Sequence, residues 1–272
     1  MQATPITNHL ATHVLDIARA AGEVIMNIYQ TMGSNRDDAN ALMVAYKPDE
    51  SPLTQADLRA HQLIAQRLSA WMPAIPVVSE EDAESLQFRQ PTGDFWLVDP
   101  LDGTKEFLAR NDEFTVNIAL IRNGKAVLGV VVAPALEQAY WGGCGIGAFR
   151  ERKGLVEAIH VAPPPNTGQT LRVVASKNHM NAETIRFMDQ LGPYTLVQAG
   201  SSLKFCRVAE GAADIYPRLG PTCEWDTAAA QAVVEAAGGY VTQLDGTPLG
   251  YGKPDILNPY FVASSISRVF AR

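Results

Sequence analysis

Two aspartates beside an apolar run are the residues in this sequence whose type and spacing best suit chemistry. In FWLVDPLDGTKEF (95–107), a buried strand is expected to end at Asp99, Pro100 to turn the chain, and Asp102 to follow. Two carboxylates at the mouth of one strand repel each other unless a proton or a cation lies between them. With hard oxygen donors and no His or Cys nearby, the cation expected is Mg²⁺, or Mn²⁺ as a substitute. The turn also makes the Leu101 carbonyl a candidate neutral ligand.

The residues after this pair suggest a phosphate-binding turn. Gly103 and Thr104 are expected to begin a short helix, whose first backbone N–H groups lack partners within the helix and suit a phosphate. The competing interpretation is that Asp99 and Asp102 only stabilise a turn, because Asp-Pro and Asp-Gly are common turn dipeptides. A haloacid-dehalogenase-type phosphatase is a weaker alternative, because its nucleophilic pattern is Asp-x-Asp-Gly-Thr and two residues separate the aspartates here.

Three further acidic residues could join the pair. Glu80 ends the apolar run PVVSE, Asp57 stands three residues after Thr54, and Asp226 begins an alanine-rich segment. Each has a structural alternative, which is respectively a solvated loop, a capping box and a helix N-cap. In the functional interpretation, Asp57 holds the hydrogen-bond network of a catalytic threonine. Four acidic segments all fit a metal site, which favours that interpretation over four separate structural roles.

The hydrophobic pattern of the first half predicts an α+β arrangement. Apolar residues at helical spacing indicate a helix over 9–31, and a second helix is expected from an N-cap at Thr54 to about Trp71. Asn123-Gly124 is a strong signal for a hairpin turn, because both residues tolerate positive φ. Strands are expected at 76–80, 95–99, 115–121, 126–133, 138–142 and 147–151.

The composition changes at VAPPPNTGQT (161–170), which suggests a boundary between two lobes. Beyond it, strands and helices alternate, as in a smaller α/β lobe. Strands are expected at 171–176 and 194–200, and helices at 181–191, 202–211 and 226–237. We therefore expect a metal-binding lobe over 1–160 and a second lobe over 161–272, with one active site between them.

The bulk properties are those of a folded globular protein. The chain has 272 residues, 47% of them hydrophobic and 19% charged, and its net charge of −7 argues against binding a nucleic-acid polymer. Three scattered cysteines, Cys144, Cys206 and Cys223, fit a reducing compartment. No basic segment precedes a long apolar core and no apolar run approaches the roughly 20 residues of a membrane helix. The expectation is a cytoplasmic protein without an integral membrane segment.

Read in order, these motifs resemble a known family. The segments Glu80-Glu81, 99–104 and 225–228 match the signatures of the lithium-sensitive inositol-monophosphatase-like superfamily. The motifs at 105–107, 113–117, 201–206 and 257–259 resemble one branch, the bacterial CysQ-type 3′(2′),5′-bisphosphate nucleotidases. The resemblance runs from about Lys47 to Ala263. It implies a layered αβαβα sandwich of the sugar-phosphatase type and catalysis with two or more Mg²⁺ ions per site.

The resemblance also assigns roles to residues. Glu80, Asp99 and the Leu101 carbonyl would hold the first Mg²⁺, and Asp99, Asp102 and Asp226 the second. Water on the first ion would be the nucleophile, oriented by Glu80 and Thr104, with Asp57 accepting a hydrogen bond from the threonine. Li⁺ would inhibit at the second position. The implied substrate contacts are Glu80, Leu101, Asp102, Gly103, Thr104, Ser202, Lys204 and Asp226.

The substrate implied by the branch is adenosine 3′,5′-bisphosphate, which would yield AMP and phosphate in sulfur metabolism. One departure is Ser176-Lys177-Asn178-His179, where the branch has Arg and Ser at the two middle positions. Lysine lacks the bidentate fork of arginine. The alternatives are an inositol monophosphatase, a broader sugar or nucleotide phosphatase, or a catalytically silent phosphate-binding protein. The family also admits peripheral attachment to the cytoplasmic face of the inner membrane, and the sequence leaves the oligomeric state open.

Overall fold

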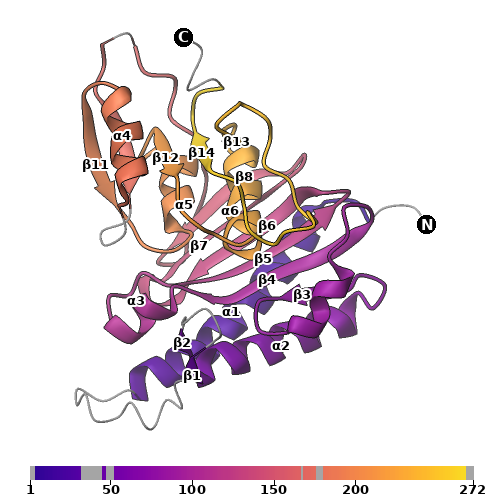
Figure 1. Ribbon diagram of the computed structural model, residues 1–272. Helices are drawn as coiled ribbons and strands as arrows, with labels where there is room; N and C mark the ends of the chain where they lie inside the picture. The colour runs from indigo at the N-terminus through magenta and orange to yellow at the C-terminus, as the bar shows by residue number, and fades with distance from the viewer. Residues whose placement is uncertain (1–3, 32–44, 47–51, 167, 176–179, 268–272) are drawn as a thin grey trace.

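The structure is a computed structural model that describes residues 4–31, 45–46, 52–166, 168–175 and 180–267. Lys47, where the resemblance begins, and the departure at 176–179 lie outside these residues. Layers of helices and sheets alternate, in the order helices, sheet, helices, sheet, and one further helix covers the outer face of the second sheet (Figure 1).

A seven-stranded sheet forms the centre of the molecule, in the order β3-β4-β5-β6-β7-β8-β9. Only β3 and β4 pair in parallel; the other neighbours are antiparallel. The predicted hairpin at Asn123-Gly124 is confirmed, with φ of 48° and 73°. The strands are β3 (Val77–Ser79), β4 (Asp94–Asp102), β5 (Thr115–Arg122), β6 (Lys125–Ala133), β7 (Gln138–Gly143), β8 (Gly147–Arg152) and β9 (Leu155–Ala158).

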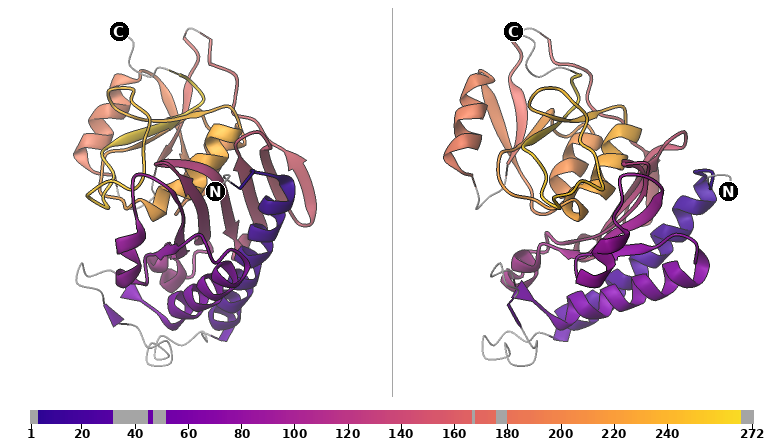
Figure 2. Two further views of the ribbon diagram at one scale, coloured as in Figure 1. Left: turned by 90° about the vertical axis from the view of Figure 1, so that its right-hand side faces the viewer. Right: turned by 45° about the vertical axis from the view of Figure 1, so that its right-hand side comes forward.

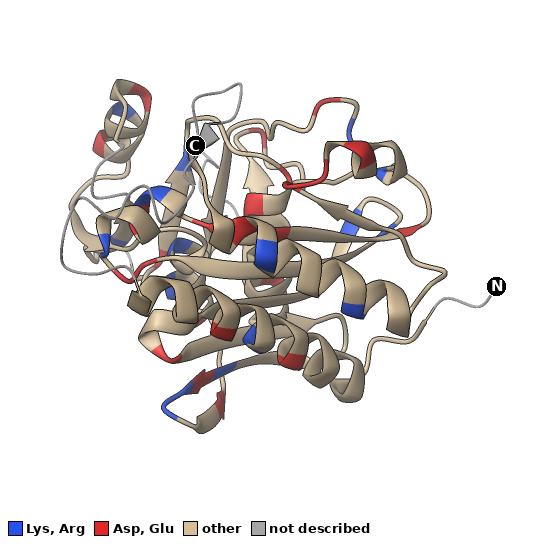
Figure 3. Ribbon diagram, turned by 90° about the horizontal axis from the view of Figure 1, so that it is seen from below, with Lys and Arg blue, Asp and Glu red and all other residues tan. Residues whose placement is uncertain are grey.

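Two long helices cover one face of this sheet, as their apolar spacing predicts. They are α1 (Asn8–Thr31) and α2 (Gln55–Trp71), and α2 begins at the expected N-cap, Thr54. Their buried side chains meet Trp96, Val98 and Ile118 of the sheet in one apolar cluster. On the outer side, acidic and basic residues are interspersed along the helices, as on an ordinary solvent-facing surface (Figure 3).

Helices α5 (Leu203–Ala209) and α6 (Trp225–Ala236) lie on the opposite face of the seven-stranded sheet. The close approach of α6 depends on a glycine in β6. A Cβ built on Gly129 would lie 1.9 Å from the carbonyl oxygen of Ala229, so any side chain there would push the helix away. This contact sets the height of α6, and therefore of Asp226, above the sheet.

A five-stranded sheet packs on the other side of α5 and α6, and α4 (Ala182–Gln190) covers its outer face (Figure 2). Adjacent residues of β10 show the two faces, since Val174 belongs to the central core and Val173 packs with α4. The implied αβαβα sandwich is confirmed. The strands run β11 (Tyr194–Gln198), β10 (Leu171–Ala175), β12 (Ile215–Arg218), β14 (Phe261–Ser264) and β13 (Tyr240–Gln243) across the sheet.

Several short elements were not predicted individually. They are β1 (Ala45–Tyr46), β2 (Pro52–Leu53), β9, β12, β13, β14 and two 3₁₀ helices, η2 (Ala83–Phe88) and η3 (Pro134–Leu136). The two larger sheets lie on either side of residue 160 in the chain, while the division into lobes there remains a prediction. Within the described residues, no helix combines the length and apolar character that crossing a bilayer requires.

Candidate active site

A bulge in β4 places two aspartates on the same face of the sheet. Asp99 pairs with Asn117 of β5, and Asp102 pairs with Thr115, with a register shift between the two pairs. Thr115 and Asn117 are two residues apart in a regular strand and therefore point to one face. Their partners, Asp99 and Asp102, point to that face as well, although residues three apart in an unbulged strand would point to opposite faces.

The prediction that β4 ends at Asp99 was wrong, because pairing resumes at Asp102. Pro100 has no N–H to give to a ladder, and the bulge leaves it unpaired without ending the strand. The Leu101 N–H turns back to donate to Asp99 Oδ1 at 3.1 Å. The Leu101 carbonyl, a predicted ligand, lies 3.3 Å from Thr104 Oγ1.

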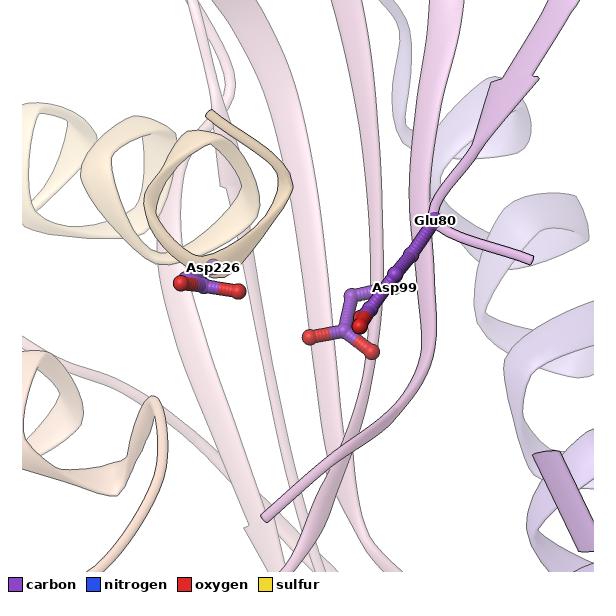
Figure 4. Close-up of side chains that lie close together, drawn as sticks. All are labelled: Glu80, Asp99 and Asp226. Carbon is purple, nitrogen blue, oxygen red and sulfur yellow. The ribbon is translucent and has the colours of Figure 1, made fainter. Parts of the chain in front are cut away.

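Three carboxylates from distant parts of the chain converge in front of β4 (Figure 4). Glu80 follows β3, and its N–H extends the pairing of that strand by donating to the Val98 carbonyl at 3.1 Å. Asp226 comes from the first turn of α6. One oxygen each from Glu80, Asp99 and Asp226 lies within 4.8 Å of the others.

The protein environment opposes ionisation of this group. Burial raises the pKa of Asp99 well above its usual range, and the charges of Glu80, Asp102 and Asp226 raise it further. The pKa of Asp226 is raised to about 8, mainly by burial and next by the charges of Asp102 and Glu80. The Cys223 N–H, which donates to Asp226 Oδ2 at 2.8 Å, acts in the opposite direction. A hard divalent cation would relieve the repulsion that protons otherwise relieve, and an all-oxygen donor set fits such a cation.

Asp102 lies beside these three residues, and hydrogen bonds fix one of its carboxylate oxygens. Its Oδ2 accepts hydrogen bonds from Ser202 Oγ at 2.8 Å, from Asn117 Nδ2 at 3.3 Å and from Thr115 Oγ1 at 3.4 Å. None of the described residues donates a hydrogen bond to its Oδ1. The sequence motifs contain Thr115 and Asn117, but only the register of β4 against β5 shows that they face Asp102.

Asp57 lies between the start of α2 and Thr104. It completes the predicted capping box, because its Oδ2 accepts the Thr54 N–H at 2.8 Å while Thr54 Oγ1 accepts the Ala56 N–H at 3.1 Å. Its other oxygen, Oδ1, lies 3.2 Å from Thr104 Oγ1. Through its two oxygens, this buried carboxylate connects the start of α2 to the threonine at the start of α3 (Thr104–Ala109).

The turn into α3 requires glycine. Gly103 is the N-cap of this helix with φ of 91°, and a Cβ there would lie 2.2 Å from Ser201 Oγ. The Ser201 hydroxyl occupies that space because it lies within hydrogen-bond distance of the carbonyls of Asp102 and Glu113, at 2.9 and 2.7 Å. The short helix predicted after Asp102 is thus confirmed.

The alternative prediction that Asp226 is an N-cap was wrong, because Glu224 occupies that position and makes no side-chain cap hydrogen bond. The Glu224 carboxylate is fully buried and instead accepts from the backbone N–H groups of Gly252 and Lys253, at 3.0 and 3.1 Å, and from Lys253 Nζ at 2.6 Å. It also lies 3.2 Å from Arg89. These long-range contacts anchor the beginning of α6, and no local signal in the sequence distinguishes them.

The predicted substrate contacts Ser202 and Lys204 lie at the start of α5, and both are buried. Burial lowers the pKa of Lys204, and the charges of Asp102 and Asp226 oppose this shift. The Nζ atom of Lys204 lies 5.8 Å from the centre of the Tyr216 ring. Tyr216 and Arg218 line a cavity of about 360 Å³ together with residues of α4 and of the segment just before it. Lys204 therefore lies close to Tyr216, one of the residues that line this cavity, and the sequence did not single out Arg218.

A model of the inositol monophosphatase family matches residues 7–270. The chain belongs to this family. It is 47% identical over 251 residues to the 3′(2′),5′-bisphosphate nucleotidase CysQ of Salmonella typhimurium, covering 91% of this chain and 96% of that protein. It is 39% identical over 256 residues to the protein of the same name from Buchnera aphidicola, covering 93% and 92%.

Two solved structures, one of them a bacterial member of the inositol monophosphatase family, have the same fold. CysQ from Bacteroides thetaiotaomicron superposes with a TM-score of 0.81 at 38% identity, covering 95% of this chain and 98% of that one. SuhB from Bartonella henselae gives a TM-score of 0.73 at 24% identity, covering 94% of each chain, which shows a shared fold alone. The family is metal-dependent, and among the described residues the cluster of Glu80, Asp99 and Asp226 could hold a metal ion.

Proposed function

We propose that this protein is a metal-dependent phosphatase that hydrolyses adenosine 3′,5′-bisphosphate to AMP and phosphate. The observation that carries the proposal is the convergence of Glu80, Asp99 and Asp226, whose mutual repulsion within a buried site calls for a bound cation. The relatives named 3′(2′),5′-bisphosphate nucleotidase supply the substrate class. The corresponding location is the cytoplasm.

The proposed metal is Mg²⁺, with Mn²⁺ as a substitute. Glu80, Asp99 and the Leu101 carbonyl would hold one ion, and Asp99, Asp102 and Asp226 a second. Bound there, the ions would supply a more acidic water and neutralise charge on the phosphate. Because these ligands come from the residue after β3, from β4 and from α6, the site depends on docking of α6 against the seven-stranded sheet.

The chain's own residues would orient the reacting groups. The Thr104 hydroxyl has one proton, and donating it to Asp57 Oδ1 leaves the oxygen lone pairs free to accept a hydrogen bond from the attacking water. Glu80 would orient the same water from the other side. Backbone N–H groups at Gly103 and Thr104 would bind the phosphate that is removed.

Lys204 would bind the rest of the substrate. A nucleoside bisphosphate carries a second phosphate. Arg218 lines the cavity of about 360 Å³, and Lys204 lies near Tyr216, another of the residues that line it. That volume lies within the range of small-molecule sites. A single-phosphate cyclitol such as inositol 1-phosphate would leave this part of the site unused.

Phosphate release from purified protein tests the proposal. With Mg²⁺, kcat/KM for adenosine 3′,5′-bisphosphate should exceed that for inositol 1-phosphate at least tenfold, about 1.4 kcal/mol. A chelator should abolish both activities. Equal rates, or the reverse order, would remove the nucleotidase assignment, and absence of any hydrolysis would favour a silent phosphate-binding protein.

A matched pair of substitutions tests the metal ligands. Asp99→Asn removes a buried carboxylate and should lower turnover by orders of magnitude. Asp16→Asn makes the same change on the outer surface of α1, where the side chain is 61% exposed, and should leave turnover unchanged. An active Asp99→Asn protein would contradict the proposed mechanism.

Millimolar Li⁺ should inhibit the parent protein, and insensitivity would argue against the second metal position.

A further inference from the structure

We propose that Asn117 and Ser202 are positioning residues that orient Asp102 toward the metal site. This inference rests on the proposed function and specifies how one of its ligands is held. Both side chains bind Oδ2 of Asp102, which leaves Oδ1 as the oxygen available to a metal.

The hydrogen-bond inventory supports this orientation. Ser202 Oγ has a single proton and lies 2.8 Å from Asp102 Oδ2 and 3.0 Å from the carbonyl of Asp226. The charged carboxylate is the stronger acceptor. Asn117 Nδ2 has two protons, one for Asp102 Oδ2 at 3.3 Å and one for Ser202 Oγ at 2.9 Å. Amide, hydroxyl and carboxylate form a closed set in which every proton has an acceptor.

The amide of Asn117 is fixed in one orientation. Flipping it would turn the amide oxygen toward the carboxylate of Asp102, which would be repulsive. In the observed orientation, Asn117 Oδ1 is buried and has no hydrogen-bond partner among the described residues. Such an atom costs about 1–3 kcal/mol. An apolar side chain would avoid this cost, so the donor group is what makes asparagine useful here.

The arrangement also joins the two layers that share the site. Asn117 belongs to β5 of the seven-stranded sheet, whereas Ser202 precedes α5 and approaches the backbone of α6 at Asp226. Both residues are 1% exposed, their side chains bind Asp102 and each other, and that of Ser202 also approaches the Asp226 carbonyl. Ser202, which the family resemblance assigns to the substrate, is therefore assigned to Asp102 instead.

Binding of Mn²⁺ to the metal-free protein, measured by calorimetry without substrate, tests this assignment. Ser202→Ala removes the hydroxyl, and Asn117→Leu removes the amide at similar volume. Ser264→Ala is the matched control, because its buried hydroxyl contacts the Ile266 carbonyl rather than a carboxylate. Losing a partner of a metal ligand typically weakens binding about 10- to 100-fold, which is the effect expected for the first two variants and not for the control.

A structural role and a positioning role give different outcomes. If Asn117 and Ser202 position Asp102, Mn²⁺ affinity falls while the metal-free unfolding free energy of Ser202→Ala changes no more than that of Ser264→Ala. Raising the metal concentration should then restore much of the lost activity. Unchanged Mn²⁺ affinity in the folded Ser202→Ala and Asn117→Leu proteins would overturn the inference. A parent protein that binds Mn²⁺ but does not hydrolyse the bisphosphate would instead refute the proposed function.

Discussion

Replacing Asp226 by Asn should stabilise the metal-free protein, and the gain should grow as pH rises. Burial and the neighbouring carboxylates raise the pKa of Asp226 from 3.8 to about 8 in the folded state. Between these values the folded protein holds a proton that the unfolded chain has released. Because the folded state then binds more protons, its stability falls with increasing pH. Asparagine is neutral at every pH and escapes this loss.

The magnitude follows from the slope of this linkage. One proton difference corresponds to about 1.4 kcal/mol for each pH unit, so the interval from pH 5 to pH 8 corresponds to at most about 4 kcal/mol. Relaxation and water entry would reduce it, and we expect the advantage of Asp226→Asn to increase by about 1–4 kcal/mol over this interval.

Urea unfolding in excess chelator at pH 5, 6, 7 and 8 measures the effect as a difference between variant and parent. Groups such as His61 and Glu235 titrate in both proteins and largely cancel. Exposed Asp16→Asn serves as the control and should show no such pH trend. Saturating Mg²⁺ should reverse the order at pH 8, because only the parent retains the ligand. A stability difference that stays flat or shrinks as pH rises would refute the reasoning.

Three further predictions concern other parts of the structure. Thr104→Ala should lower kcat by about 10²–10⁴-fold, whereas Thr104→Ser should retain most activity, and equal rates for the two variants in a steady-state assay would exclude a role for the hydroxyl. Glu210→Gln should lower the unfolding free energy by about 3 kcal/mol in urea titrations, because the buried Glu210 accepts hydrogen bonds from Arg150 and Arg207; a loss below about 0.5 kcal/mol would contradict this. Lys204→Met should lower kcat/KM for adenosine 3′,5′-bisphosphate about 10- to 100-fold and affect inositol 1-phosphate less, and a uniform loss would argue against a contact with the second phosphate.

Much of this architecture could be predicted from local patterns alone. The helix over 9–31, the N-cap at Thr54 and the hairpin at Asn123-Gly124 depend on residues close together in the chain, and all three are confirmed. The weakly patterned strands were not, because β12 contains Pro217 and β13 and β14 are short. Their existence depends on partners from distant segments, which propensity does not encode.

The candidate site divides in the same way. Residue types and order in the sequence were enough to nominate Glu80, Asp99, Asp102 and Asp226 and the chemistry that they suit. Only the tertiary structure brings an oxygen of Glu80, Asp99 and Asp226 within 4.8 Å of the others, since they come from different strands and a helix.

The bulge in β4 and the partners behind the acids were also decided by tertiary structure. In a regular strand Asp99 and Asp102 would point to opposite faces, and the register shift against β5 brings them to the same face. Asn117, Ser202 and Glu224 acquire their roles from contacts with residues far away in the chain. The identity of the candidate ligands is a local property of the sequence, while their geometry results from long-range packing.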